Sequence, residues 1–100
     1  LRVLGNRKNE GIVFKNLGNV YEALGDYDSA IVSYEKSLQI AREVNNKGEE
    51  GKTLSNLGQI YANQGQYEKA IATFQTSFKI SSSINDITGQ TSTLINLGST

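Results

Sequence analysis

The chain of 100 residues is long enough for one small domain, and its apolar fraction of 37% is too high for a disordered segment. Lys and Arg together number 10, as do Asp and Glu, so the net charge of zero gives no electrostatic basis for binding a nucleic acid or an anionic membrane. Cysteine and histidine are absent, which excludes disulfides, thiolate metal sites and catalysis by a Ser–His or Cys–His pair within the chain. We expect no enzymatic activity, no cofactor and no bound metal.

The ends of the sequence bear on its origin. No apolar run approaches the roughly 20 residues of a membrane span, and no signal-peptide pattern opens the chain, so we expect a cytoplasmic protein. The chain begins with Leu1 and stops inside a motif that also occurs earlier in it. We therefore expect it to be a piece of a longer protein.

Apolar residues recur at helical spacing in both halves of the sequence. Apolar side chains at three- and four-residue spacing between Phe14 and Leu24 predict a first helix. Gly25 breaks this pattern, and Asp26 is placed to cap a second helix. The same periodicity returns in the second half, without strand-like alternation. The helices that we expect are 9–24, 27–44, 48–64, 67–83 and 87–100.

A forty-residue repeat organises these helices. Residues 11–50 and 51–90 are identical at 12 of 40 positions, which indicates two copies of one unit. The triplet Asn-Leu-Gly begins at Asn16, Asn56 and Asn96. We expect residues 1–10 to hold the end of a preceding unit and a linker, 11–50 and 51–90 to be full units, and 91–100 to begin a third.

Each unit is predicted to be two antiparallel helices joined by a short turn. Because one hairpin cannot bury its apolar side alone, stacked units are expected to form an all-α, right-handed solenoid. Gly25 lies at the turn, where a glycine allows the chain to reverse. Gly18 and Gly58 lie inside first helices, where the missing side chain would let the second helix approach closely near Ala30 or Ala70. The tyrosines lie on the apolar stripes, so we expect them to pack there with the hydroxyl at the rim, and not to form a stacking platform for bases.

A set of positions recurs in phase in the two units. In the first unit they are Phe14, Leu17, Gly18, Tyr21, Gly25, Tyr27, Ala30 and Tyr34, and in the second they are Leu54, Leu57, Gly58, Tyr61, Gly65, Tyr67, Ala70 and Phe74. This pattern resembles the tetratricopeptide repeat. The long unit is similar to the variant in kinesin light chains, G-protein-signalling modulators and large bacterial signalling proteins. Arg42 and Ser82 stand where the family usually has a proline, and Ser37 and Ser77 replace its second-helix alanine.

One face of the predicted first helices is polar without being strongly charged. A helical wheel places Asn16 and Asn56 opposite the apolar stripe, among amides and hydroxyls. Side-chain amides donate and accept hydrogen bonds, so a row of them can hold the main chain of an extended peptide. The resemblance implies that this face is concave and that the asparagine before Leu-Gly holds the ligand backbone. The expected peptide-binding residues are Asn16, Asn56 and Asn96 for the backbone, and Lys15, Asn19, Lys52, Ser55, Gln59 and Asn63 for specificity.

Two other interpretations of these residues stay open. The asparagines would also be explained if they capped helices, bridged neighbouring units, or recurred without a role because the units share ancestry. The resemblance further suggests a clamp for a C-terminal carboxylate, because Lys15, Asn19 and Asn56 match three of its positions. Ser92 and Asn96 stand where that clamp has two basic residues, so it would lose its strongest charge-assisted bonds.

We expect a protein-interaction module that binds a peptide or a partner protein on the concave face. The alternatives are a structural or oligomerisation spacer, and a regulatory segment of a larger signalling protein or enzyme. Solenoids need about three repeats for stability, so we expect the chain either to self-associate through its exposed repeat ends or to be only marginally stable. The apolar residues without a following helix to cover them are Ile84, Ile87, Leu94, Ile95 and Leu97.

Overall fold

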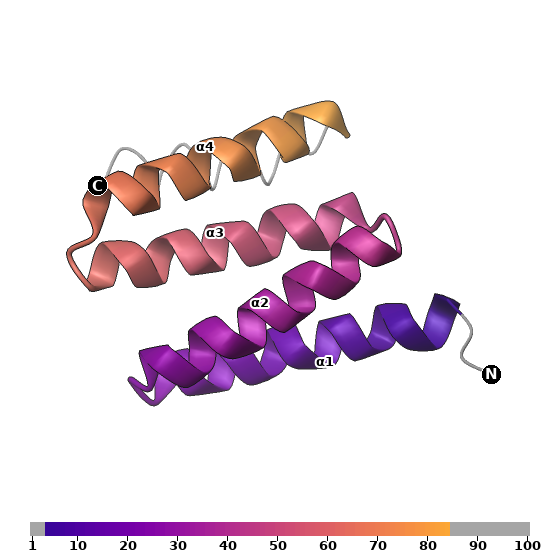
Figure 1. The fold of residues 1–100 in the computed structure, drawn as a ribbon, viewed down its shortest axis with the longest axis horizontal. Coiled ribbons are helices and arrows are strands. Elements are labelled where there is room, and N and C mark those ends of the chain that lie inside the picture. Colours follow the sequence, from indigo (N-terminus) through magenta and orange to yellow (C-terminus); the bar gives the residue numbers. More distant parts are fainter. Residues whose placement is uncertain (1–3, 85–100) are drawn as a thin grey trace.

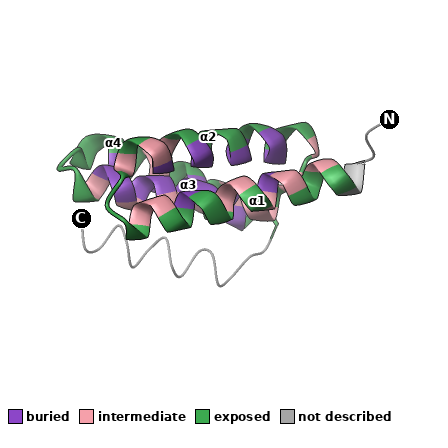
Figure 2. Ribbon diagram, turned by 90° about the horizontal axis from the view of Figure 1, so that it is seen from below, coloured by how far each residue is buried: buried purple, intermediate pink, exposed green. Residues whose placement is uncertain are grey.

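Four α-helices form the part of the chain that the structure, a computed structural model, describes: residues 4–84. They are α1 (Leu4–Ala23), α2 (Tyr27–Glu43), α3 (Lys47–Asn63) and α4 (Tyr67–Ser83). Successive helices pack side by side, as Figure 1 shows. Seen from below, α1 and α3 lie in one layer and α2 and α4 in the other (Figure 2). The two helical hairpins confirm the predicted all-α architecture, whereas the predicted fifth helix lies outside the described residues.

The predicted start of the first helix was wrong. The helix begins at Leu4 and runs without interruption through the segment that was expected to be a linker. That segment contains no proline, and Arg7 ties it to the hairpin. The guanidinium lies 2.8 Å from Glu43 on α2 and 2.8 Å from Glu10 on the next turn of α1. These ion pairs stabilise the first turns of the helix, which precede the apolar stripe that begins at Phe14 and on which the prediction was based.

The turns use left-handed backbone conformations. Gly25 and Gly65 each have a φ of +79°, which confirms the turn predicted at Gly25. Asn45 takes the same role between α2 and α3 with a φ of 55°. The side chain of Asp26 accepts a hydrogen bond of 3.2 Å from the Ser29 N–H, so the predicted cap of α2 is confirmed.

The helical glycines make room for an aromatic ring. A Cβ added at Gly18 would lie 2.5 Å from Tyr34 Cδ1, and one at Gly58 would lie 2.6 Å from Phe74 Cε1. The close approach was predicted one turn earlier, at Ala30 and its counterpart. Those alanines are fully buried, but the rings lie against the glycines because a flat side chain fills the space that a Cβ would otherwise take.

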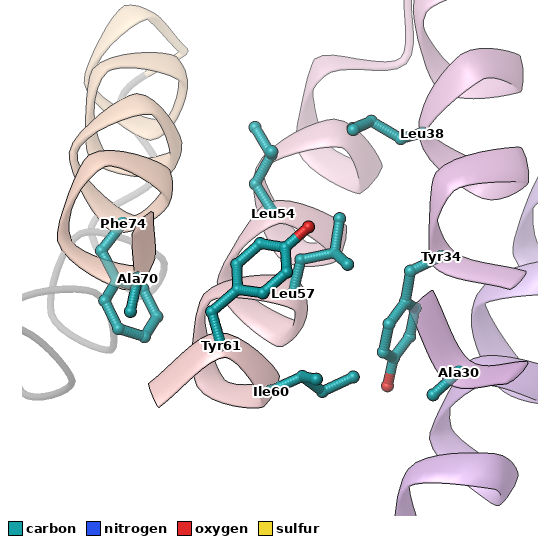
Figure 3. Packing of buried hydrophobic residues seen from close by; sticks show 9 residues of the cluster. All are labelled: Ala30, Tyr34, Leu38, Leu54, Leu57, Ile60, Tyr61, Ala70 and Phe74. Carbon is teal, nitrogen blue, oxygen red and sulfur yellow. The ribbon is translucent and has the colours of Figure 1, made fainter. Parts of the chain in front are cut away.

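The hydrophobic core surrounds α3. In Figure 3, Leu57 and Ile60 lie between Tyr34 and Leu38 of α2 on one side and Phe74 of α4 on the other. All five residues are buried. The core therefore spans the two hairpins, and among the described residues α2 packs between α1 and α3 while α3 packs between α2 and α4.

One tyrosine does not pack as predicted. Tyr34 and Tyr61 are buried, but 55% of Tyr67 is exposed. Its counterpart Tyr27 is partly buried, because Asn63 of α3 lies against its hydroxyl. Among the described residues, no helix lies beside α4 in the position that α3 takes beside α2.

Candidate peptide-binding face

The layer of first helices carries two rows of polar side chains. On α1, Asn16 and Asn19 lie one turn apart, and both are exposed. On α3, Asn56, Gln59 and Asn63 repeat at three- and four-residue spacing, which places them on one side of the helix. The predicted site residues of the described hairpins thus belong to two neighbouring helices of one layer (Figure 2).

The two rows meet at Asn19 and Asn56. The amide nitrogen of Asn56 donates a hydrogen bond of 3.3 Å to the side-chain oxygen of Asn19. Asn56 therefore pairs with a residue one turn beyond Asn16, its own counterpart in the repeat. The expected ladder of equivalent asparagines is staggered between α1 and α3, and Asn96 lies outside the described residues.

Tyr34 of α2 contacts Asn19 from the interior of the hairpin and so helps to hold the contact between the two rows in place. Its ring is fully buried, and its hydroxyl faces the side-chain oxygen of Asn19 and, at 2.8 Å, Oε1 of Glu22. Burial raises the pKa of Tyr34 well above its usual range, and the Glu22 carboxylate raises it further. The hydroxyl carries one proton, so it donates to one of the two acceptors at a time.

The sequence contained a signal for this anchor that residue-by-residue reasoning missed. In the second hairpin Phe74 stands in place of Tyr34, and Ala62 stands in place of Glu22. The hydroxyl and its carboxylate partner are therefore both present in one unit and both absent from the other. Such joint replacement is expected of two groups that satisfy each other's hydrogen bonds.

Lys15 is not an open cation on this face. Its ammonium lies 2.6 Å from Oε2 of Glu49, and the two side chains are only 16% and 17% exposed. Glu49, an acid in the first turn of α3, thereby links α3 to α1. A ligand carboxylate at Lys15 would have to displace Glu49, which disfavours the carboxylate clamp. Lys52 is exposed, with its ammonium 4.0 Å from the other oxygen of Glu49.

Ser55 faces the second helix of its own hairpin. Its hydroxyl lies 2.7 Å from the hydroxyl of Ser77 on α4, and Ser77 donates a hydrogen bond of 2.7 Å to the carbonyl oxygen of Gly51. Ser55 thus contributes to packing within the hairpin.

Further along α3, the amide of Gln59 donates a hydrogen bond of 3.0 Å to the side-chain oxygen of Asn63. The amide of Asn63 donates in turn to the hydroxyl of Tyr27, at 3.4 Å. The hydrogen bonds of the amides on α3 therefore extend to Tyr27 at the start of α2.

Antiparallel hairpins in two layers, with equivalent residues forty positions apart in equivalent places, define a helical-repeat protein. The sequence profile of the tetratricopeptide repeat matches residues 9–83, and the chain belongs to that family. Proteins of this family generally mediate protein–protein interactions. A search among curated proteins finds no match. Within residues 4–84, no helix has the length and apolar character needed to cross a membrane.

Proposed function

We propose that the chain binds an extended peptide segment of a partner protein across the face formed by α1 and α3. The hydrogen bond between Asn19 and Asn56 carries this proposal, because it joins the polar side chains of two helices into one strip. We call the strip the amide strip and define it as Asn16, Asn19, Asn56, Gln59 and Asn63.

The residues of the amide strip suit the main chain of a peptide. A peptide in extended conformation presents N–H and C=O groups along its length, and each amide side chain pairs with either kind. We assign main-chain recognition to Asn16 and Asn56, and to Asn96 in the next unit. Lys52 adds a positive charge at one end of the strip, with 62% of its side chain exposed.

Lys15 and Ser55 support this face from its edges. Lys15 holds Glu49 and thus the start of α3 against α1, and Ser55 holds α3 against α4. The two residues act on the position of the amide strip, without a direct contact to the peptide.

Part of the amide strip is held in place before a ligand arrives. Asn56 contacts Asn19, and Asn19 contacts the buried hydroxyl of Tyr34. Since fixing a free side chain costs roughly 0.5–1.5 kcal/mol on binding, this arrangement favours a ligand that pairs with Asn56.

The test uses peptides selected from a random library for binding to the full chain. Asn56→Ala should weaken several peptides of unrelated sequence by about tenfold each, because a lost main-chain contact affects them alike. Gln75→Ala, at an exposed position of α4 outside the amide strip, is the control and should leave the affinities unchanged. Titration of labelled peptides measures the affinities, and circular dichroism checks that each variant keeps its helices.

Full affinity of all selected peptides for Asn56→Ala would overturn the proposal. A loss confined to one peptide sequence would also count against it, because that result indicates side-chain recognition.

A structural role in assembly draws on a different observation. Val13, Leu17 and Val20 are exposed on α1, although each is apolar. A surface of this kind favours contact with another protein element, and it borders the amide strip, because Asn16 lies one turn from both Val13 and Val20.

A further inference from the structure

Glu22 lies on the side of α1 that faces α3. Lys15, Asn19 and Glu22 follow one another at four- and three-residue spacing, which places them in one row along the helix. The first two reach α3, because Lys15 pairs with Glu49 and Asn19 accepts a hydrogen bond from Asn56. Glu22 therefore lies one turn beyond the contact at which the amide strip crosses from α1 to α3.

Oxygen atoms of three side chains converge at this point. Oε1 of Glu22 lies 2.8 Å from the hydroxyl of Tyr34, which also contacts the side-chain oxygen of Asn19. When the hydroxyl gives its one proton to Asn19, the Glu22 oxygen faces another oxygen with no proton between them. This part of the face is therefore richer in hydrogen-bond acceptors than in donors, and it favours a ligand that brings donors.

No cation of the described chain balances the charge of Glu22. Within residues 4–84, the ion pairs of Lys and Arg side chains are made with other carboxylates. Glu49, which also lies at the contact of α1 with α3, pairs with Lys15, whereas the sequence has no Lys or Arg between Asn16 and Glu35. Glu22 is only partly buried, so a ligand can reach it. A carboxylate that has lost part of its water attracts a cation more strongly than a fully solvated one.

We infer that Glu22 binds a basic side chain of the peptide. This inference rests on the proposed function and adds the chemistry of its ligand. A guanidinium carries five N–H donors in a planar fork, and an ammonium carries three. Either group can donate to the carboxylate and to the Asn19 oxygen together, and so brings both the charge and the donors that are lacking there. Arginine fits better than lysine, because its fork matches the two oxygens of a carboxylate.

An exposed cation of the same face, Lys52, lies on the other side of the contact between Asn19 and Asn56. It precedes Asn56 by one turn of α3, whereas Glu22 follows Asn19 by one turn of α1, and the two helices run in the same direction (Figure 1). At a rise of about 1.5 Å per residue, the two charges are about 10 Å apart along the helices, which an extended peptide spans in about three residues. The ligand therefore carries its basic residue about three positions from an acidic residue that meets Lys52.

The test begins with short random peptides displayed as a library and selected on the full chain and on its variant Glu22→Gln. The glutamine keeps an oxygen for the Tyr34 hydroxyl but lacks the negative charge. Peptides selected on the native chain should be enriched in arginine or lysine at one position, near an acidic residue at the spacing given above. Peptides selected on Glu22→Gln should lose the preference for the basic residue and keep the acidic one.

Affinity titrations of a selected peptide then measure the contact. Glu22→Gln should weaken the peptide by about tenfold, and so should glutamine in place of its basic residue. The two changes together should cost little more than either alone, because both remove the same contact. Glu35→Gln removes the same charge at an exposed position of α2 and is the matched control, for which the affinity should stay unchanged. Circular dichroism checks that each variant keeps its helices.

The outcomes separate this inference from the proposed function. Peptides that weaken with Asn56→Ala but bind Glu22→Gln at full affinity would overturn the role of Glu22 and leave the amide strip supported. Losses from Glu22→Gln and from the peptide change that simply add would also overturn it, because the basic residue would then bind elsewhere. Peptides that depend on neither Asn56 nor Glu22 would overturn both proposals.

Discussion

The Tyr34 hydroxyl joins the buried core of the first hairpin to the polar face. Tyr34→Phe removes two alternative hydrogen bonds but leaves the ring against Gly18. Asn19 is exposed and Glu22 partly so, and water therefore replaces the lost partner. We expect the free energy of unfolding at neutral pH to fall by about 1 kcal/mol, measured by urea denaturation.

The pH dependence of this effect follows from the raised pKa of Tyr34. Below the ordinary tyrosine pKa of 10.0 the hydroxyl keeps its proton in both states, and its contribution to stability is fully present. Above that pH the unfolded chain loses the proton first, so the contribution declines as the pH rises. The stability difference between the native chain and Tyr34→Phe should narrow above pH 10.0, and a constant difference would contradict this account.

At the scale of the helix and its turn, backbone conformation decides which residue is tolerated. No atom lies within 4 Å of a Cβ added at Gly65, so the cost of Gly65→Ala comes from the φ of +79° alone. We expect a loss of about 1–2 kcal/mol in the free energy of unfolding. Asn45→Gly, at a φ of 55°, should be nearly neutral or slightly stabilising. Denaturation of the two variants side by side measures both effects, and equal losses would show that the turn conformation is not the cause.

The extent to which sequence predicted each element depended on where the relevant contacts lie. The bounds of α4 matched the prediction, because its periodicity and turns are local. The start of α1 did not, because it rests on the contact of Arg7 with Glu43, far away in sequence. Periodicity places Leu17 on the apolar stripe but does not show whether another helix covers it.

For the candidate site too, features within one helix could be predicted from the sequence, whereas contacts between helices could not. The amide composition of the face is visible in the sequence, and the structure brings Asn19 and Asn56 together. The pairing of Lys15 with Glu49 joins two helices, so no spacing rule within one helix could predict it. A comparison of the two units could have indicated Glu22, because its replacement by Ala62 accompanies that of Tyr34 by Phe74.

Across the whole molecule, the described helices differ in the number of sides on which they are covered. Helix α3 packs against α2 and α4, whereas α1 packs mainly against α2 and leaves Val13, Leu17 and Val20 exposed. Because local opening is easier where less apolar surface is buried, amide hydrogens in α1 should exchange about tenfold faster than those in α3. Hydrogen exchange read by mass spectrometry or NMR measures this gradient. Equal protection of the two helices would contradict it.

The single proton of Tyr34 allows two hydrogen-bond arrangements at the proposed binding face, because the hydroxyl donates either to Asn19 or to Glu22. When the hydroxyl points to Asn19, it meets a carbonyl oxygen, and Asn56 presents its nitrogen to the same oxygen. When the hydroxyl points to Glu22, its own oxygen is open to an N–H, so the Asn19 amide can turn over and Asn56 can turn with it. A partner that offers a donor selects one arrangement, and a partner that offers an acceptor selects the other. Under the proposed function, Asn56 would therefore pair with either an N–H or a C=O group of the peptide main chain.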